Sequence, residues 1–153
     1  MKRNVVQIGD EVLRKVCRPI KKFDGELWAI LQDMHDTVIA ENGAGLAAPQ
    51  IGLDLRMAVI NVDEGYFELI NPTIVATKGE QEGPEGCLSV KGKQGTVIRP
   101  YKVKVEYQDR KGKKHKLTAE DFFARAICHE LDHLDGVLYV DKAFDVLDVG
   151  EEE

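Results

Sequence analysis

The stretch from residue 118 to residue 134, TAEDFFARAICHELDHL, decides the fold expected for this chain, because it predicts one long helix that carries reactive side chains. His129 and His133 are four residues apart, so they lie on the same face of a helix and both rings can bind one metal ion. Gly136 follows the last apolar residue, as it does at many helix ends. We therefore expect a helix whose histidine face turns towards the core.

The start of this helix is marked by Thr118 and Asp121, which have the spacing of a capping box. We expect the helix to occupy residues 119–134. A second long helix is predicted near the N-terminus, where Asp24 is a suitable N-cap and apolar residues recur at helical spacing. Gly43 is expected to stand just past the end of that helix.

Between the two helices the sequence favours extended structure. Apolar and β-branched residues form short runs bounded by turn residues, at 55–62, 66–70, 73–77, 96–98, 101–108 and 114–117. Strands in the middle and helices at both ends predict an α+β fold, with central antiparallel or mixed β-strands packed around the C-terminal helix that carries the His-Glu-x-x-His motif. No repeat or linker divides the chain, so we expect a single domain over residues 1–153, in which 143–153 form an acidic, frayed tail.

The charge and hydropathy patterns narrow the functional class. A formal net charge of -6 argues against a general nucleic-acid surface, so no direct nucleic-acid binding is expected. The basic run at 111–115 is interpreted as a solvated hairpin turn. The N-terminus lacks the apolar core of a signal peptide, and no run approaches the roughly 18 apolar residues of a membrane span. We therefore expect a cytoplasmic protein without membrane contact.

The motif at 129–133, His-Glu-Leu-Asp-His, indicates a metallohydrolase. It combines two metal ligands with Glu130, whose carboxylate can take a proton from water at the ion. A third ligand is needed. One class of peptidases supplies a histidine shortly after the motif, but Tyr139 stands at that position. A second class supplies a glutamate well downstream, and little of the chain remains there.

Cys87 is the strongest candidate for the third ligand. It lies in the glycine-flanked segment Glu85–Ser89, and a thiolate with two imidazoles leaves one coordination position open for water. Cys128 points away from His129 on the predicted helix, and Cys17 belongs to no motif. We expect both of these cysteines to be buried structural thiols.

A small-residue segment, Gly-Ala-Gly-Leu-Ala-Ala-Pro-Gln, occupies residues 43–50. It lacks the Gly-Lys-Ser/Thr ending of a P-loop and the third glycine of a dinucleotide-binding fingerprint, so nucleotide binding is not expected. Its small residues allow the backbone to pass close to a compact ligand, and Gln50 adds a side-chain N–H donor. These features favour a binding segment for a small ligand.

Together, the segments at 43–50, 85–89 and 129–133 resemble the three signature motifs of the peptide deformylase family, in the same order. The likeness extends over nearly the whole chain. It implies a metal-dependent hydrolase that removes the N-formyl group from N-formylmethionine at the start of newly made polypeptides and releases formate. The His-Glu-x-x-His motif alone leaves open a small zinc endopeptidase or a non-catalytic metal-binding protein.

The resemblance also implies how the residues around the metal are used. Cys87, His129 and His133 correspond to the family's ligands for one divalent ion, which is usually Fe2+, with Ni2+, Co2+ or Zn2+ able to replace it. Glu130 corresponds to the carboxylate that acts first as base and then as acid. Arg99 is expected to support the site by pairing with Glu85 or Asp132, since metal ligands need oriented partners.

Further roles follow from the same resemblance. The Gln50 side-chain amide and the Leu88 backbone N–H correspond to donors for the oxyanion. Gly45 is implied to bond to the substrate backbone. The implied substrate-binding set is drawn from three segments: Gly43, Ala44, Gly45, Glu85, Phe122, Arg125 and Ala126.

The expected partners are N-formylmethionyl nascent peptides, with transient contact to the ribosome. Some bacterial relatives end in a basic helix that docks there. This chain instead ends in a run rich in acidic residues from Asp145 to Glu153, so we do not expect that docking mode.

Overall fold

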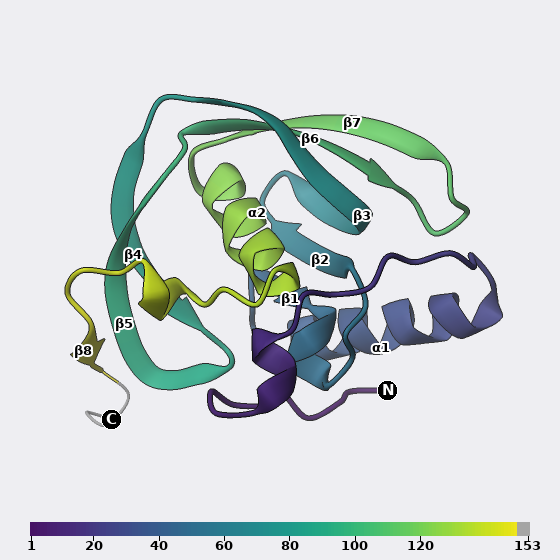
Figure 1. Cartoon of the computed structure of the whole chain (residues 1–153), viewed down its shortest axis with the longest axis horizontal. Helices are drawn as coiled ribbons and strands as arrows, with labels where there is room; N and C mark the ends of the chain where they lie inside the picture. Colours follow the sequence, from purple (N-terminus) through teal and green to yellow (C-terminus); the bar gives the residue numbers. More distant parts are fainter. Residues whose placement is uncertain (150–153) are drawn as a thin grey trace.

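The computed structural model describes residues 1–149, which contain two α-helices, three short 3-10 helices and eight strands (Figure 1). In chain order the elements are η1 (Glu11–Arg14), α1 (Gly25–Ala40), β1 (Gly45–Ala47), η2 (Ala48–Ile51), β2 (Met57–Val62), β3 (Gly65–Lys78), β4 (Gln81–Cys87), β5 (Val90–Arg99), β6 (Lys102–Gln108), β7 (Lys114–Glu120), α2 (Asp121–Leu134), η3 (Tyr139–Asp141) and β8 (Leu147–Asp148). The expected α+β fold, with strands around a C-terminal helix, is confirmed.

The strands form two antiparallel sheets, one of five strands in the order β1-β2-β3-β6-β7 and one of three in the order β4-β5-β8. Successive side chains of a strand point to opposite faces. In β2, Ala58 and Ile60 belong to the apolar cluster around α2, whereas Met57 and Val59 belong to the cluster around α1. The two helices therefore cover opposite faces of the five-stranded sheet, and Figure 1 shows α2 in the middle of the molecule, between that sheet and β4–β5.

Helix α1 begins as its sequence predicts, because the Asp24 side chain accepts a hydrogen bond from the Leu27 N–H at 3.3 Å. Gly43 stands just past the end of α1, as expected. The residue in the left-handed conformation is Asn42, with φ of 59°, and not Gly43. The Gly43 N–H closes the helix by donating to the Val38 carbonyl at 3.0 Å. From Gly43 the chain then leads directly into β1.

Helix α2 begins two residues later than the capping-box pattern predicts, and that prediction is wrong. Thr118 lies in β7, opposite Lys104 of β6, and the pairing of these strands continues to Glu120. Glu120 is the N-cap, and its side chain makes no capping hydrogen bond. The gain from continued strand pairing exceeds that of a side-chain cap, so the helix starts where the sheet stops.

Two of the predicted strands are one. The runs at 66–70 and 73–77 both belong to β3, and its register against β6 shifts between Ile70 and Thr73. At the shift, Asn71 has a φ of 51° and its side-chain amide donates to the Ile20 carbonyl and the Gln108 side chain. A sequence that reads as a turn is therefore a bulge inside a long strand.

The acidic C-terminal segment is ordered in part, contrary to the expected frayed tail over 143–153. The Phe144 N–H donates to the Thr96 carbonyl, and β8 pairs with Lys93 and Gln94 of β5. Residues 150–153 lie outside the described part. In residues 1–149, no helix has the length and apolar character needed to cross a membrane.

Candidate active site

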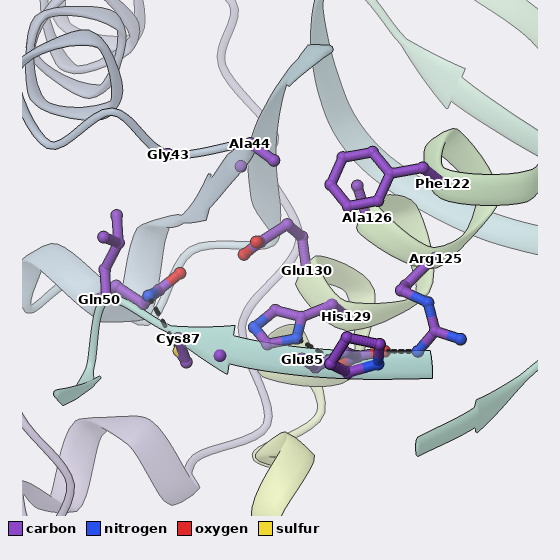
Figure 2. Close-up of a pocket in the computed structure, with 14 residues that line it drawn as sticks. Gly43, Ala44, Gln50, Glu85, Cys87, Phe122, Arg125, Ala126, His129 and Glu130 are labelled. Carbon is purple, nitrogen blue, oxygen red and sulfur yellow. Dashed lines mark hydrogen bonds and ion pairs between the residues drawn. The ribbon is translucent and has the colours of Figure 1, made fainter. Parts of the chain in front are cut away.

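The three motif segments meet at one cavity of about 320 Å³, within the usual range for small-ligand pockets. Loop 42–44 and β1 form one side, the end of β4 a second and α2 a third. Figure 2 shows Gly43 and Ala44 across the pocket from Phe122 and Ala126, with Glu130 between them. Every predicted site residue except His133 lines this cavity, and His133 is fully buried.

Cys87, His129 and His133 come together although 42 residues separate the first two. One potential ligand atom from each lies within 4.8 Å of the others. The Cys87 Sγ is 3.4 Å from Nε2 of His133, and the rings of His129 and His133 have centroids 5.2 Å apart. The cysteine stands at the last residue of β4, where the chain turns back, and both histidines project from α2.

This set of donors fits a divalent metal ion. Two imidazoles and one thiolate form a ligand set that borderline metals accept, with one position left open. The Nδ1 atom of His129 is 2.9 Å from Oε1 of Glu85, so this carboxylate orients the ring and leaves Nε2 for a metal. The chemistry and the orientation of the donors therefore agree.

Glu85 is the centre of a buried ionic network. Its carboxylate accepts two hydrogen bonds from Arg99, at 2.8 and 2.9 Å, and one from Arg125 at 2.6 Å. The expected pairing of Arg99 is confirmed for both candidate partners, because its Nη1 also donates to Asp132 at 2.6 Å. Burial alone would raise the pKa of Glu85, but the hydrogen bonds from Arg99 and His129 hold it well below its usual range.

Glu130 has a very different environment, although it stands next to His129 on α2. Its side chain is buried, and its Oε1 has no hydrogen-bond partner within residues 1–149. Burial raises the pKa of Glu130 to about 7. Figure 2 shows its carboxylate pointing towards the side of the pocket where Gln50 lies. A carboxylate with this pKa and with one oxygen unpartnered in the described part of the chain is suited to proton transfer near neutral pH.

The Gln50 amide is held in a fixed orientation by three contacts. Its Oε1 accepts from the Ala47 N–H at 2.9 Å, and its Nε2 lies 3.2 Å from the Ser89 Oγ and 3.6 Å from the Cys87 Sγ. The oxygen is therefore turned towards the backbone, and the NH2 group faces the cysteine. Leu88, next to that cysteine, also lines the cavity.

The wall formed by α2 is partly open to solvent. Phe122 is 55% exposed, whereas Arg125 and Ala126 are buried. The Arg125 guanidinium faces β4 and β5, where it donates to the carbonyls of Gly83 and Val97 as well as to Glu85. Its apolar stem is thus the part available to the cavity.

The two remaining cysteines have no such setting. Cys17 and Cys128 are both 5% exposed, and burial raises the pKa of each thiol to about 11. A thiol with a raised pKa is rarely ionised and is therefore a poor nucleophile or ligand.

Three neighbours of the site had no assigned role in the sequence interpretation. Ser89 contacts the Gln50 amide, and the Gln7 side chain donates to the Leu88 carbonyl at 2.9 Å. The Tyr139 ring stacks on His129 with centroids 5.9 Å apart. Ser89 stands inside a recognised motif and could have been considered, but nothing in the local sequence indicates the contacts of Gln7 or Tyr139.

Comparison with known proteins agrees with this geometry. The family model described as polypeptide deformylase matches residues 2–147. The peptide deformylase of Thermoanaerobacter pseudethanolicus is 54% identical over 151 residues, covering 99% of this chain and 95% of that protein. A solved peptide deformylase structure from Thermotoga maritima has a TM-score of 0.92 and 36% identity, covering 95% of this chain and 99% of that one. One from Legionella pneumophila has a TM-score of 0.91 and 42% identity, with coverages of 94% and 87%.

Matches of this extent, with motif residues gathered at one cavity, show that the chain belongs to the peptide deformylase family, the metal-dependent hydrolases that remove the N-formyl group from newly made polypeptides.

Proposed function

We propose that this deformylase holds one divalent ion with Cys87, His129 and His133 and moves protons with Glu130. The observation that carries the proposal is the convergence of the three potential ligand atoms within 4.8 Å, beside a buried carboxylate that is free to exchange a proton. The hydrogen bond between His129 and Glu85 supports it, because it leaves the other ring nitrogen available.

We propose Fe2+ as the native ion, with Ni2+, Co2+ or Zn2+ able to replace it. The support for iron is the resemblance to the family, since intrinsic affinity for this ligand set would favour zinc. When bound, such an ion acts as a Lewis acid that makes water more acidic and polarises the formyl carbonyl.

Glu130 is proposed to take a proton from the attacking water as the water oxygen bonds to the formyl carbon. The same carboxylate then gives that proton to the nitrogen of the methionine as the carbon–nitrogen bond breaks. Formate and a free amine are the products. The raised pKa of Glu130 supports this double role, because the group can hold and release a proton near neutral pH.

The negative charge that develops on the formyl oxygen requires hydrogen-bond donors. We assign these to the side-chain amide of Gln50 and the backbone N–H of Leu88, both at the cavity and next to Cys87. The hydrogen bond from the Ala47 N–H supports this assignment, because it holds the Gln50 oxygen away and presents the NH2 group.

The substrate is proposed to occupy the cavity between loop 42–44 with β1 and helix α2. The proposed binding set is the one expected from the sequence: Gly43, Ala44, Gly45, Glu85, Phe122, Arg125 and Ala126. All seven line the cavity. For Glu85 the role is indirect, because its carboxylate bonds to protein groups and orients His129.

We also propose a cytoplasmic location and transient contact with the ribosome, since the substrate is a nascent chain. The small zinc endopeptidase considered from the sequence is not favoured, because the family match covers residues 2–147 and the relatives compared above are peptide deformylases.

The decisive test is formate release from an N-formylmethionyl peptide by protein purified without oxygen, with metal content measured in the same sample. We expect formate from protein loaded with iron or nickel and no cleavage of the unformylated peptide. No formate from fully loaded protein, or cleavage of internal peptide bonds, would contradict the proposal. Iron-loaded protein should also lose activity faster in air than under argon, because Fe2+ beside a thiolate is prone to oxidation.

A further inference from the structure

Gly45 and Glu130 pack so closely that a residue with a side chain would not fit at position 45 without a shift. A Cβ atom placed on Gly45 would lie 2.7 Å from Cγ of Glu130 and 2.8 Å from its Oε2. Real Cβ atoms essentially never approach other atoms this closely. The contact involves the part of Glu130 that carries the carboxylate, and not the flexible end of a surface side chain.

The backbones of both residues are held in place. Gly45 is paired with Ile60 in the five-stranded sheet, and the neighbouring Ala44 carbonyl accepts from the Asn61 N–H at 2.7 Å. Glu130 lies on α2, and almost all residues around it on this helix are buried. A methyl group at position 45 would therefore displace the Glu130 side chain more readily than it would displace either backbone.

The backbone conformation does not itself require glycine here. Gly45 is absent from the residues of positive φ, in contrast to Gly52 and Gly136. An alanine could adopt the same backbone angles, so the steric conflict with Glu130 is the local obstacle. This separates Gly45 from glycines that serve a turn.

We propose that Gly45 is a positioning residue for Glu130, and that its missing side chain leaves the space in which the carboxylate carries a proton from water to the amine. The inference rests on the proposed role of Glu130. Because Oε1 of Glu130 has no hydrogen-bond partner in residues 1–149, packing against Gly45 replaces an anchor while leaving the carboxylate free to exchange its proton. This role is additional to any bond between the Gly45 backbone and the substrate, since alanine keeps that backbone.

The kinetic test is Gly45→Ala in the metal-loaded enzyme. We expect kcat to fall by about 10²-fold, the scale associated with misplacing a reacting group by about 1 Å, while KM and metal content stay unchanged. A raised KM with normal kcat would overturn the inference, because the methyl group would then obstruct the substrate and not the base. Gly25→Ala is the matched control, since a Cβ there meets nothing within 4 Å and its φ is not positive; its kinetics should equal those of the parent enzyme.

A thermal unfolding cycle tests the contact without relying on catalysis. Gly45→Ala alone should lower the midpoint by an amount on the order of 5 °C, as expected for overpacking. In a Glu130→Ala background the same change should lower the unfolding midpoint very little, because Cγ and the carboxylate of residue 130 are gone. If Gly45→Ala fails to fold, a folded Gly45→Ala/Glu130→Ala protein supports the inference. Equal loss in both backgrounds, or an unfolded double variant, would overturn it.

The two hypotheses can fail separately. Full activity of Glu130→Ala would contradict the proposed function, whatever the unfolding cycle shows. An inactive Glu130→Ala together with an unchanged kcat in Gly45→Ala would contradict only the positioning role of Gly45.

Discussion

Two carboxylates of the site, those of Glu85 and Glu130, are equally buried but are held in opposite ways. They are 6% and 5% exposed. Glu85 accepts hydrogen bonds from two arginines and is bonded to His129, and its pKa is held well below the usual range. For Glu130, burial raises the pKa to about 7, and Oε1 has no partner in residues 1–149. Hydrogen bonds to the ionised form thus make one carboxylate a permanent anion, and their lack leaves the other able to change its protonation state.

In this site, support and chemistry are therefore assigned to different carboxylates. The network around Glu85 fixes the orientation of His129, a proposed metal ligand, and gains from rigidity. The proposed proton carrier, Glu130, needs freedom to exchange with water and with the leaving amine, and in our proposal it is positioned by packing against Gly45. Changing either carboxylate, or a partner of one, tests one side of this comparison.

The largest effect is expected from Glu130→Gln, which keeps the size of the side chain and removes the proton acceptor. Formate release should fall by about 10²- to 10⁴-fold, the range typical of a lost acid–base group. The fold should persist, because this side chain anchors no hydrogen-bond network among residues 1–149. Steady-state formate assays on metal-loaded protein give the ratio, and a variant with near-normal kcat would show that Glu130 does not carry the proton.

Glu85→Gln should destabilise the protein strongly. It removes the carboxylate that Arg99 and Arg125 share, which leaves Arg99 with Asp132 alone and Arg125 without a counter-ion among the described residues; breaking such a buried pair costs about 3–5 kcal/mol. The matched control is Glu68→Gln, which removes the partner of Arg110 in a pair that is partly open to solvent and should cost at most about 1 kcal/mol. Urea unfolding measures both free energies. Equal losses of unfolding free energy in Glu85→Gln and Glu68→Gln would mean that the buried network has no special structural role.

The activity should decrease at acidic pH because Glu130 is a base only when ionised. Burial raises its pKa to about 7 from the ordinary value of 4.5 for a glutamate, and a bound cation would favour the ionised form and bring the pKa partly back. We therefore expect kcat/KM to rise with pH, with a midpoint between these two values. The profile must be recorded with metal content measured at each pH. A flat profile down to pH 4.5 at constant metal content would contradict the assignment.

The smallest effect is expected from Asp132→Asn at the rim of the network. Asp132 accepts from Arg99 at 2.6 Å and pairs with Lys142 at 3.0 Å, but its side chain is 21% exposed. Water can compensate in part, and asparagine keeps a hydrogen-bond acceptor, so a loss of up to about 1 kcal/mol is expected. A loss larger than that of Glu85→Gln in the same unfolding assay would show that Arg99 depends more on Asp132 than on Glu85.

The sequence predicts well where one local rule decides the structure. Asp24 caps α1 as expected, and the i, i+4 spacing puts His129 and His133 on one face of α2. It fails where distant pairing overrides the local signal. Thr118 has the spacing of a cap but lies in β7, because pairing with β6 extends through that position.

The candidate site shows the same division between features that the local sequence predicts and contacts that depend on distant residues. The motifs indicate the proposed ligands and the proposed base, since metal binding and proton transfer require particular residue types at particular spacings. They do not show that Arg99 bonds to Glu85 and Asp132 at once, or that Gly45 packs against Glu130. These contacts join residues that are far apart in the chain, so only the folded structure reveals them.

The most direct test of the separation between support and chemistry is to measure metal affinity and formate release side by side for Glu130→Gln and Glu85→Gln. We predict that Glu130→Gln binds metal as the parent does and has almost no activity. Glu85→Gln should bind metal about 10- to 100-fold more weakly, the usual cost of losing the group that orients a ligand, and should recover activity when excess metal restores occupancy. Loss of metal affinity in Glu130→Gln, or parental affinity in Glu85→Gln, would contradict the account.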